Sequence, residues 1–511
     1  MRTIRCDRLL HLKSLLIIGV FSLLLTFLIL TYSSSDMHHS NEDAFSHGEP
    51  GVFRMSQKKV IKEKVKGKKS KVVDEEETPV FHKDTRPPLM VKRMSEYCNL
   101  PHDMSVAQQG LAPKDYQLLN VHTVIRHGDR SPIFRLPGLD RSDLSCLLDA
   151  DQYLHLPKVA SFAHVLAASS DQLPRDSTFN RWALYPSHKI CGEGQLTGQG
   201  AVQHIMNGML YSERYMHQHR LFDESNWEQR YLVHTTEVSR TFQSAIAFSY
   251  GLLPQFDLKR LNLFRSGSLE FCEDRVFHGA CRCPGLEMFR SQAERECKMS
   301  AADTKLYTAL KKHVDEVLHL RGQNIPGPSS LMDGLSHLAC HSIPLPCNSN
   351  GTCITAKAYE TVWRLIDAKT KCLGQNLKYK KFAKALMHGL LFRISREFSI
   401  AIQNGSNPTF HLYSGHDTTV TPLITALELS NNVWPRFATT ITFELFKKQS
   451  KGDHYIRILK NGQLVTSEAI FCRGRTDENG MCAFSHFSNY VASQKLKEFC
   501  DSLKPVMKKF F

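Results

Sequence analysis

Residues 118–130 read Leu118-Leu119-Asn120-Val121-His122-Thr123-Val124-Ile125-Arg126-His127-Gly128-Asp129-Arg130. The first eight residues are largely apolar or β-branched, and this predicts a buried strand that ends at Arg126. Arginine, histidine and glycine follow the strand at once. Because glycine has no side chain, the backbone at Gly128 can approach a ligand closely. The segment therefore predicts a binding site at the end of a buried strand.

Further strands and helices are expected along the chain after this segment. We expect strands at 231–236, 410–414, 439–446 and 455–459, and helices after 195–200 and at 303–320, 378–402 and 419–429. Strands that alternate with helices and end in polar residues are typical of an α/β sheet with its site at the strand tips. The cysteine-rich stretch from about 256 to 400 is expected to be an insertion or cap on that core.

The residues that follow the first strand suit phosphate chemistry. Arg126 and Arg130 carry planar guanidinium groups that match phosphate oxygens. His127 lies between them and can attack phosphorus while its imidazole is neutral. The flanking positive charges favour that neutral form. We therefore predict covalent catalysis, in which a phosphorylated His127 is later hydrolysed by water.

Two later strand ends supply the remaining groups. Asp417 can protonate the departing alcohol and then accept a proton from water, while His416 can donate to a phosphoryl oxygen. Arg240, just after the strand at 231–236, adds a third guanidinium that would stabilise the transferring group. An isolated aspartate at a strand end often only caps a helix. The prediction therefore depends on the three strand ends together.

The cysteines indicate an oxidising compartment. The chain has 511 residues and 15 cysteines, and all but Cys6 follow an apolar run near the N-terminus. An even number of cysteines beyond such a run favours disulfides, up to seven of them, over metal binding. The chain also lacks any Cys-x-x-Cys pair, which metal sites often use. Asn350 and Asn404 begin glycosylation triplets on the same side of the run.

The N-terminal region predicts a membrane anchor and a stem. Residues 14–32 are almost wholly apolar, which is just long enough to cross a bilayer, and basic residues within 1–13 keep that end cytoplasmic. A cleaved signal peptide is the competing interpretation. Residues 33–96 hold a lysine cluster and too few large apolar residues to pack. This stem is either a solvated linker or a contact for an anionic polymer or membrane surface, and no nucleic-acid partner is expected.

The motifs resemble one known family, the histidine acid phosphatases. Its signatures match at 126–132 (Arg-His-Gly-Asp-Arg-Ser-Pro) and 415–417 (Gly-His-Asp), with further matching segments at 194–200 and 239–245, all in the family's order. The resemblance runs from about Gln117 to Cys500 and implies a histidine-phosphatase core of the phosphoglycerate-mutase-like kind, a mainly helical cap and no metal or cofactor. It also implies functional roles for six residues: His127 as nucleophile, Asp417 as proton donor, and Arg126, Arg130, Arg240 and His416 as phosphate ligands.

A closer resemblance within the family concerns the substrate. It is carried by the anchor and basic stem and by the segments 250–257, 272–284, 435–438, 443–445 and 457–462. These segments look like a Golgi branch of the family that acts on phosphorylated xylose in the proteoglycan linkage region. This resemblance implies a type II Golgi membrane protein with a luminal domain at 97–511. It also implies a glycosyltransferase as a possible partner. The alternatives are a broad lysosomal or secreted acid phosphatase and a non-catalytic protein that binds anionic glycans. Gly415 departs from the family pattern, since many relatives have alanine there.

Overall fold

The part of the chain that is described here comes from a computed structural model. It comprises residues 92–99, 114–134, 136, 139, 144–169, 173, 177–272, 283, 285–320, 327–404, 409–429 and 433–507. All of them belong to one unit, residues 77–511. The expected tail, transmembrane segment and nearly all of the stem lie outside these residues. Among the residues described, no helix is long and apolar enough to span a bilayer.

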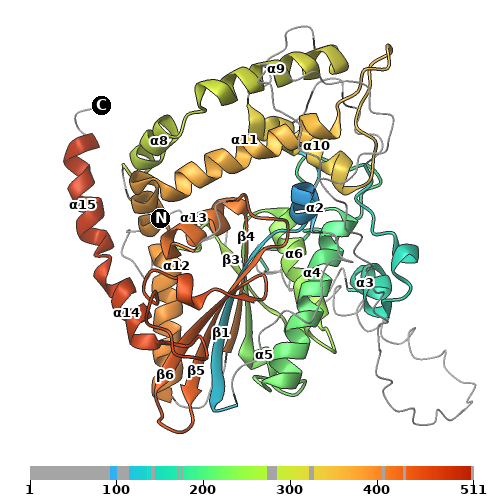
Figure 1. The fold of residues 1–511 in the computed structure, drawn as a ribbon. Helices are drawn as coiled ribbons and strands as arrows, with labels where there is room; N and C mark the ends of the chain where they lie inside the picture. Colours follow the sequence, from blue (N-terminus) through green and yellow to red (C-terminus); the bar gives the residue numbers. More distant parts are fainter. Residues whose placement is uncertain are drawn as a thin grey trace, which may run out of the picture. The chain divides into compact units, whose positions relative to one another are not determined.

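A mixed eight-stranded sheet forms the centre of this unit (Figure 1). Its strands are β1 (Tyr116–Arg126), β2 (Tyr231–Thr236), β3 (Asn262–Ser266), β4 (Thr409–Gly415), β5 (Thr440–Lys448), β6 (His454–Lys460), β7 (Gln463–Leu464) and β8 (Cys482–Ala483). The order is β3-β2-β4-β1-β5-β6-β7, and β8 also pairs with β6. The strands β1 to β4 pair in parallel, whereas β5 and β6 are antiparallel to their neighbours.

The helices were predicted in the right places, although several more exist. They are α2 (Lys92–Cys98), α3 (Pro157–Ala168), α4 (Gly198–Tyr211), α5 (Trp227–Arg230), α6 (Ser239–Leu252), α8 (Leu286–Glu296), α9 (Ala301–Leu318), α10 (Pro328–Cys340), α11 (Ala356–Gln375), α12 (Leu377–Asn404), α13 (Asp417–Leu427), α14 (Phe484–Ser493) and α15 (Leu496–Met507). Short helical turns are η3 (Ala150–Tyr153), η4 (Ser212–Gln218), η5 (Leu258–Arg260) and η6 (Thr466–Glu468).

Two hydrophobic layers cover the two faces of the sheet. Side chains of α3, α4 and α6 pack on one face, and those of α12, α13 and α14 pack on the other. The helices α8 to α11 form a further layer beyond one end of the sheet (Figure 1). Because α10 contacts the loop that follows β1, this is the end at which the parallel strands finish. The ends of the parallel strands therefore face the helical cap.

The predicted strands at 118–125, 231–236, 410–414, 439–446 and 455–459 are confirmed as β1, β2, β4, β5 and β6. The edge strand β3 was not predicted. It lies within the range expected for the cap, yet it pairs with β2 in the sheet. Its residues are exposed or only half-buried, and Phe264 is 48% exposed. Such a short edge strand lacks the apolar run from which a buried strand is predicted.

The predicted disulfides are present. Six bonds join Cys98–Cys340, Cys146–Cys191, Cys283–Cys500, Cys297–Cys372, Cys347–Cys353 and Cys472–Cys482, and Cys272 is also disulfide-bonded. The first of these joins α2 to the end of α10 across 242 residues of sequence. Cross-links over such separations stabilise a fold mainly by restricting the unfolded chain. Here the Cys98–Cys340 bond ties the cap helix α10 to α2, whose Tyr97 contacts Arg126.

Candidate active site

The strand register brings the predicted site residues to one edge of the sheet. Arg126 at the end of β1 is paired with Gly415 at the end of β4. In the neighbouring pair, Thr235 of β2 is opposite Ser414 of β4. Since these strands are parallel, the residues that follow them emerge side by side. His127, Asp417 and the start of α6 therefore meet, although Asp417 lies 291 positions after Arg126, the residue that precedes His127.

Two glycines allow the loop after β1 to lie directly on α4. A Cβ atom on Gly128 would come within 2.2 Å of the Gly200 carbonyl oxygen, and one on Gly200 within 2.2 Å of the Asp129 carbonyl oxygen. No other residue fits at either position without moving the backbone. The two sequence motifs that contain these glycines are therefore needed for the same contact, in which the loop after β1 packs against the start of α4. This contact sets the position of His127.

His127 is buried and neutral. Its side chain is 1% exposed, and Nδ1 lies 2.8 Å from the Gly128 carbonyl oxygen. A carbonyl only accepts, so Nδ1 carries the hydrogen and Nε2 keeps a free lone pair. Burial lowers the pKa of His127 well below its usual value, and the charges of Arg240 and Arg126 lower it further. The ring is therefore a neutral nucleophile across the physiological range.

Arg126 is held rigidly by groups from three parts of the chain. Its guanidinium donates to the Pro435 carbonyl oxygen at 2.6 Å, to the Tyr97 hydroxyl at 3.3 Å and to Asp417 Oδ2 at 3.0 Å. The group also lies 4.5 Å from the ring centroid of Phe437. A guanidinium fixed in this way loses little conformational entropy when it binds an anion.

Arg130 and Arg240 complete a cluster of three guanidinium groups. Arg130 Nη2 forms an ion pair with Asp333 Oδ1 at 2.8 Å. Burial and the nearby charge of Arg130 lower the pKa of Arg240 to about 10. In addition, the Nε atoms of Arg126, Arg130 and Arg240 are buried and have no protein partner. Because unpaired buried donors are costly, this cluster is suited to an anion.

His416 is also neutral and lies between two side chains. Its Nε2 is 2.8 Å from Thr236 Oγ1, and its Nδ1 is 3.4 Å from Arg240 Nη2. Arginine only donates, so Nδ1 accepts and Nε2 carries the hydrogen. Burial and then the charge of Arg240 lower the pKa of His416 to about 4. The ring can thus donate one hydrogen bond without carrying charge.

Asp417 is the first residue of α13 and faces the guanidinium cluster. Burial raises its pKa, but Arg126 and Arg130 outweigh burial, so the net pKa is lowered. The free carboxyl group is therefore ionised. A phosphate dianion bound to the same arginines would offset their charge and raise the pKa of Asp417. This is the change that a proton donor for the leaving alcohol requires.

Several residues of the site were not found from the sequence. Tyr97 and Pro435 contact Arg126, Thr236 contacts His416, and Asp333 contacts Arg130. Pro435 and Thr236 lie within segments that were noted, whereas Tyr97 does not, and Asp333 lies in a cap helix about 200 positions from its partners. No local spacing identifies it. Among the described residues, no group of three or more metal-ligating side chains occurs.

Both glycosylation candidates are accessible. Asn350 is exposed in the turn that the Cys347–Cys353 disulfide closes. Asn404 is exposed at the end of α12, although the rest of its triplet lies outside the described residues. Exposure at a turn and at a helix end is what a glycan requires, since the acceptor must lie on the surface.

The site combines a neutral buried histidine, a carboxyl group from a second strand and three converging guanidinium groups. These are the groups that a phosphoric monoester hydrolase needs for nucleophilic attack, proton transfer and phosphate binding. The chain has this activity, and it belongs to branch 2 of the histidine phosphatase superfamily. The family model matches residues 117–276 and 365–461, which carry almost all of β1, all of β2 to β6, and all six predicted site residues.

Named relatives agree with this family. The chain is 32% identical over 416 residues to 2-phosphoxylose phosphatase 1 of Xenopus tropicalis, with 80% of this chain and 81% of the relative covered. It is 32% identical to the Homo sapiens protein of the same name, over 77% of this chain and 81% of the relative. Lysosomal acid phosphatase of Bos taurus is 26% identical over 51% of this chain and 61% of its own length.

The solved structures that match this chain are more distant in sequence. The phytase of Hafnia alvei without ligand is 17% identical, with a TM-score of 0.47 over 75% of this chain and 98% of the phytase. The phytase of Citrobacter braakii is 16% identical, with a TM-score of 0.48 over 75% of this chain and 99% of the phytase.

Proposed function

We propose that this chain removes phosphate from a phosphorylated sugar in two steps, through a phosphohistidine on His127. One observation carries the proposal: a neutral His127 lies in a cluster of three guanidinium groups, with Asp417 on the neighbouring strand end. Nucleophile and proton donor are thus separate residues that face the same anion site. This separation allows the phosphorus to be attacked on one side while the leaving oxygen is protonated on the other.

In the first step, Nε2 of His127 attacks phosphorus and forms a P–N bond. The P–O bond to the sugar breaks, and protonated Asp417 gives its proton to the departing oxygen. The guanidinium groups bind the equatorial oxygens, where negative charge is concentrated. His416 joins them when its Nε2–H leaves Thr236 for a phosphoryl oxygen.

In the second step, a water molecule replaces the imidazole. Asp417, now a carboxylate, takes a proton from this water while the water oxygen attacks phosphorus. The P–N bond breaks, and inorganic phosphate leaves. Asp417 is protonated again, and His127 returns to its neutral form. Each step is an easier displacement than direct hydrolysis of the ester.

Asp417→Asn is expected to slow the first step in proportion to the basicity of the leaving group. Asparagine keeps the shape of the side chain but supplies no acidic proton. Turnover of alkyl or sugar phosphates should fall by about 10²–10⁴-fold. Phosphorylation of His127 by p-nitrophenyl phosphate should fall far less, since its phenolate leaves without a proton. Burst kinetics with both esters measure this step, and an equal loss on both would contradict the role of Asp417.

The proposed substrate is xylose phosphorylated at O2 in the linkage region of proteoglycans. Support comes from the relatives named 2-phosphoxylose phosphatase 1, which align with at least 77% of this chain. The match to lysosomal acid phosphatase covers only 51%. Removal of this phosphate would regulate the extension of glycosaminoglycans. We further propose a single-pass type II protein of the Golgi membrane with a luminal catalytic domain and with a glycosyltransferase as its partner there.

A panel of phosphate esters tests the substrate. The full-length chain, purified in detergent, is assayed on a phosphoxylose linkage oligosaccharide, a phosphopeptide, a nucleoside monophosphate and p-nitrophenyl phosphate. We expect kcat/KM for the oligosaccharide to exceed the values for the phosphopeptide and the nucleotide by about 10²-fold or more, as differential transition-state binding allows. Comparable turnover of every ester would instead identify a broad acid phosphatase. No turnover of any ester would favour a protein that only binds anionic glycans.

A further inference from the structure

The cap helix α10 contacts the catalytic loop through both oxygens of one carboxylate. Asp333 Oδ1 pairs with Arg130 Nη2 at 2.8 Å. Asp333 Oδ2 accepts hydrogen bonds from the backbone N–H groups of Ile133 at 2.7 Å and Phe134 at 2.9 Å. The Asp333 side chain is only 7% exposed. One buried carboxylate therefore joins a phosphate-binding guanidinium to the next segment of the same loop.

That next segment is apolar and exposed. The side chain of Ile133 is 40% exposed and that of Phe134 is 48% exposed. A Cβ atom on Gly194 would lie 3.1 Å from Ile133 Cγ1 and 3.3 Å from Arg240 Nη1, so Ile133 and Arg240 are neighbours. Ile133 therefore borders the guanidinium cluster, and Phe134 follows it on the same loop with its backbone N–H on the same Asp333 oxygen. The pair Ile133 and Phe134 is called the rim below. A substrate bound there by its phosphate would bring its next atoms against the rim.

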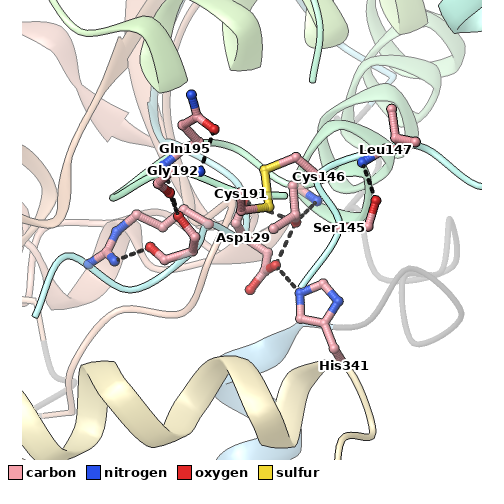
Figure 2. The surroundings of a disulfide bond; sticks show 12 residues. Asp129, Ser145, Cys146, Leu147, Cys191, Gly192, Gln195 and His341 are labelled. Atoms are coloured by element: carbon pink, nitrogen blue, oxygen red, sulfur yellow. Dashed lines mark hydrogen bonds and ion pairs between the residues drawn. A yellow bond between two sulfur atoms is a disulfide. The ribbon is translucent and has the colours of Figure 1, made fainter. Parts of the chain in front are cut away.

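A second contact fixes α10 on the loop. His341, just after the end of α10, lies with Nε2 at 2.7 Å from Asp129 Oδ2, as Figure 2 shows. The Thr197 hydroxyl donates to the same oxygen at 2.6 Å. The preceding residue, Cys340, is bonded to Cys98. Because the end of α10 is held in this way, the position of Asp333 relative to the loop is set from outside the loop.

We propose that Asp333 is a positioning residue that holds Arg130 and the rim in one arrangement, so that phosphate is bound while the rim receives the sugar that carries it. The part about the sugar rests on the proposed function. A sugar ring presents C–H groups on its faces, and these can bury the exposed apolar surface of Phe134. The part about Arg130 concerns phosphate alone and does not depend on the sugar.

The charges around Asp333 explain why this one residue can hold both Arg130 and the rim. Arg130 is 8% exposed, and Arg240 and Arg126 add positive charge nearby. Burial opposes the charged form of Arg130, but Asp333, Tyr97 and Asp417 together outweigh burial, with Asp333 the largest of them, so the pKa of Arg130 is raised. Without the carboxylate, the guanidinium would be repelled by its neighbours and two backbone N–H groups would lose their acceptor. Arg130 and the rim would then both move.

Asp333→Asn in the full-length protein tests the first part. We expect the inhibition constant for inorganic phosphate to rise about tenfold or more, because Arg130 loses the charge-assisted pair with Asp333 that holds it in place. Asp303→Asn is the matched control, since Asp303 pairs with Arg364 in the cap at 3.2 Å and contacts no predicted site residue. An unchanged inhibition constant in folded Asp333→Asn protein, or an equal change in the control, would overturn the proposal. Titrating active sites with a phosphate ester keeps misfolded protein out of the measurement.

Phe134→Ala tests the second part without disturbing the core. We expect kcat/KM for the sugar phosphate to fall about fivefold to tenfold, as loss of this much apolar contact predicts. Turnover of methyl phosphate and inhibition by inorganic phosphate should not change. Leu154→Ala, at a residue 69% exposed, is the control for removing an exposed apolar side chain. An unchanged ratio between the two esters would exclude the rim as a sugar subsite. If the enzyme turns over no sugar phosphate at all, the proposed function fails while the Asp333 result still stands.

Discussion

Replacement of His127 with alanine is expected to lower kcat by on the order of 10⁴–10⁶-fold, as loss of a covalent nucleophile does elsewhere. The buried imidazole supplies the only neutral nitrogen that we assign to attack on phosphorus. A water molecule in the vacated space would face three guanidinium groups and would lack a base at the right position. The arginines would still bind phosphate, so the loss should fall on kcat more than on binding.

Two measurements check this expectation. Single-turnover assays should show no acid-labile phosphoenzyme in His127→Ala, while inorganic phosphate still binds with an inhibition or dissociation constant close to that of the unmodified protein. His155→Ala, at an exposed histidine of no assigned role, is the control. If His127→Ala keeps more than about one hundredth of the activity, the nucleophile lies elsewhere and the two-step mechanism is wrong.

The second large effect concerns stability in acid. His122, His234 and His411 lie side by side on the face of the sheet that α12 covers. The rings of His122 and His411 are stacked with centroids 4.2 Å apart, and the rings of His234 and His411 are 5.8 Å apart. Burial lowers the pKa of His411 to about 3 and the pKa values of the other two well below the usual range. Three titratable rings are thus held neutral inside the fold.

The sign of the effect follows from these shifts. The unfolded histidines take up protons below about pH 6.5, whereas the folded ones do not. The stability that depends on these rings being neutral is therefore fully present above pH 6.5. It is lost as the pH falls toward the pKa values of the folded state. At pH 5 each ring lowers the free energy of unfolding by about 2 kcal/mol, or about 6 kcal/mol together. His341 acts in the opposite direction, since Asp129 outweighs burial and raises its pKa.

Equilibrium unfolding in urea under non-reducing conditions, at pH 7.5, 6.5, 5.5 and 5, measures this loss. His411→Phe keeps the stacked ring but removes one titration, so its decline between pH 6.5 and 5 should be shallower by about 2 kcal/mol. His155→Phe should leave the decline unchanged. A free energy of unfolding that stays constant between pH 7.5 and 5 would contradict the expectation.

Local patterns were sufficient to predict the parts of this protein that bury apolar runs. The strand before His127 and the strands before Arg240 and His416 were all predicted, because a strand that is buried in a parallel sheet reads as a continuous apolar run. Once three such strands are placed in parallel, their ends must meet, and this brought the candidate residues together. The cysteines after the apolar run likewise indicated disulfides, although not their pairing.

The sequence by itself therefore determined the core strands and the chemical groups that the strands carry to one edge. Only the tertiary structure decided what surrounds those groups. Asp333 reaches Arg130 across about 200 residues, Tyr97 reaches Arg126 from the start of the described domain, and β3 joins the sheet from a segment expected in the cap. The neutral state of His127 was expected from its arginine neighbours, yet burial is its largest cause. Contacts between distant segments and burial depend on packing, and no local spacing encodes packing.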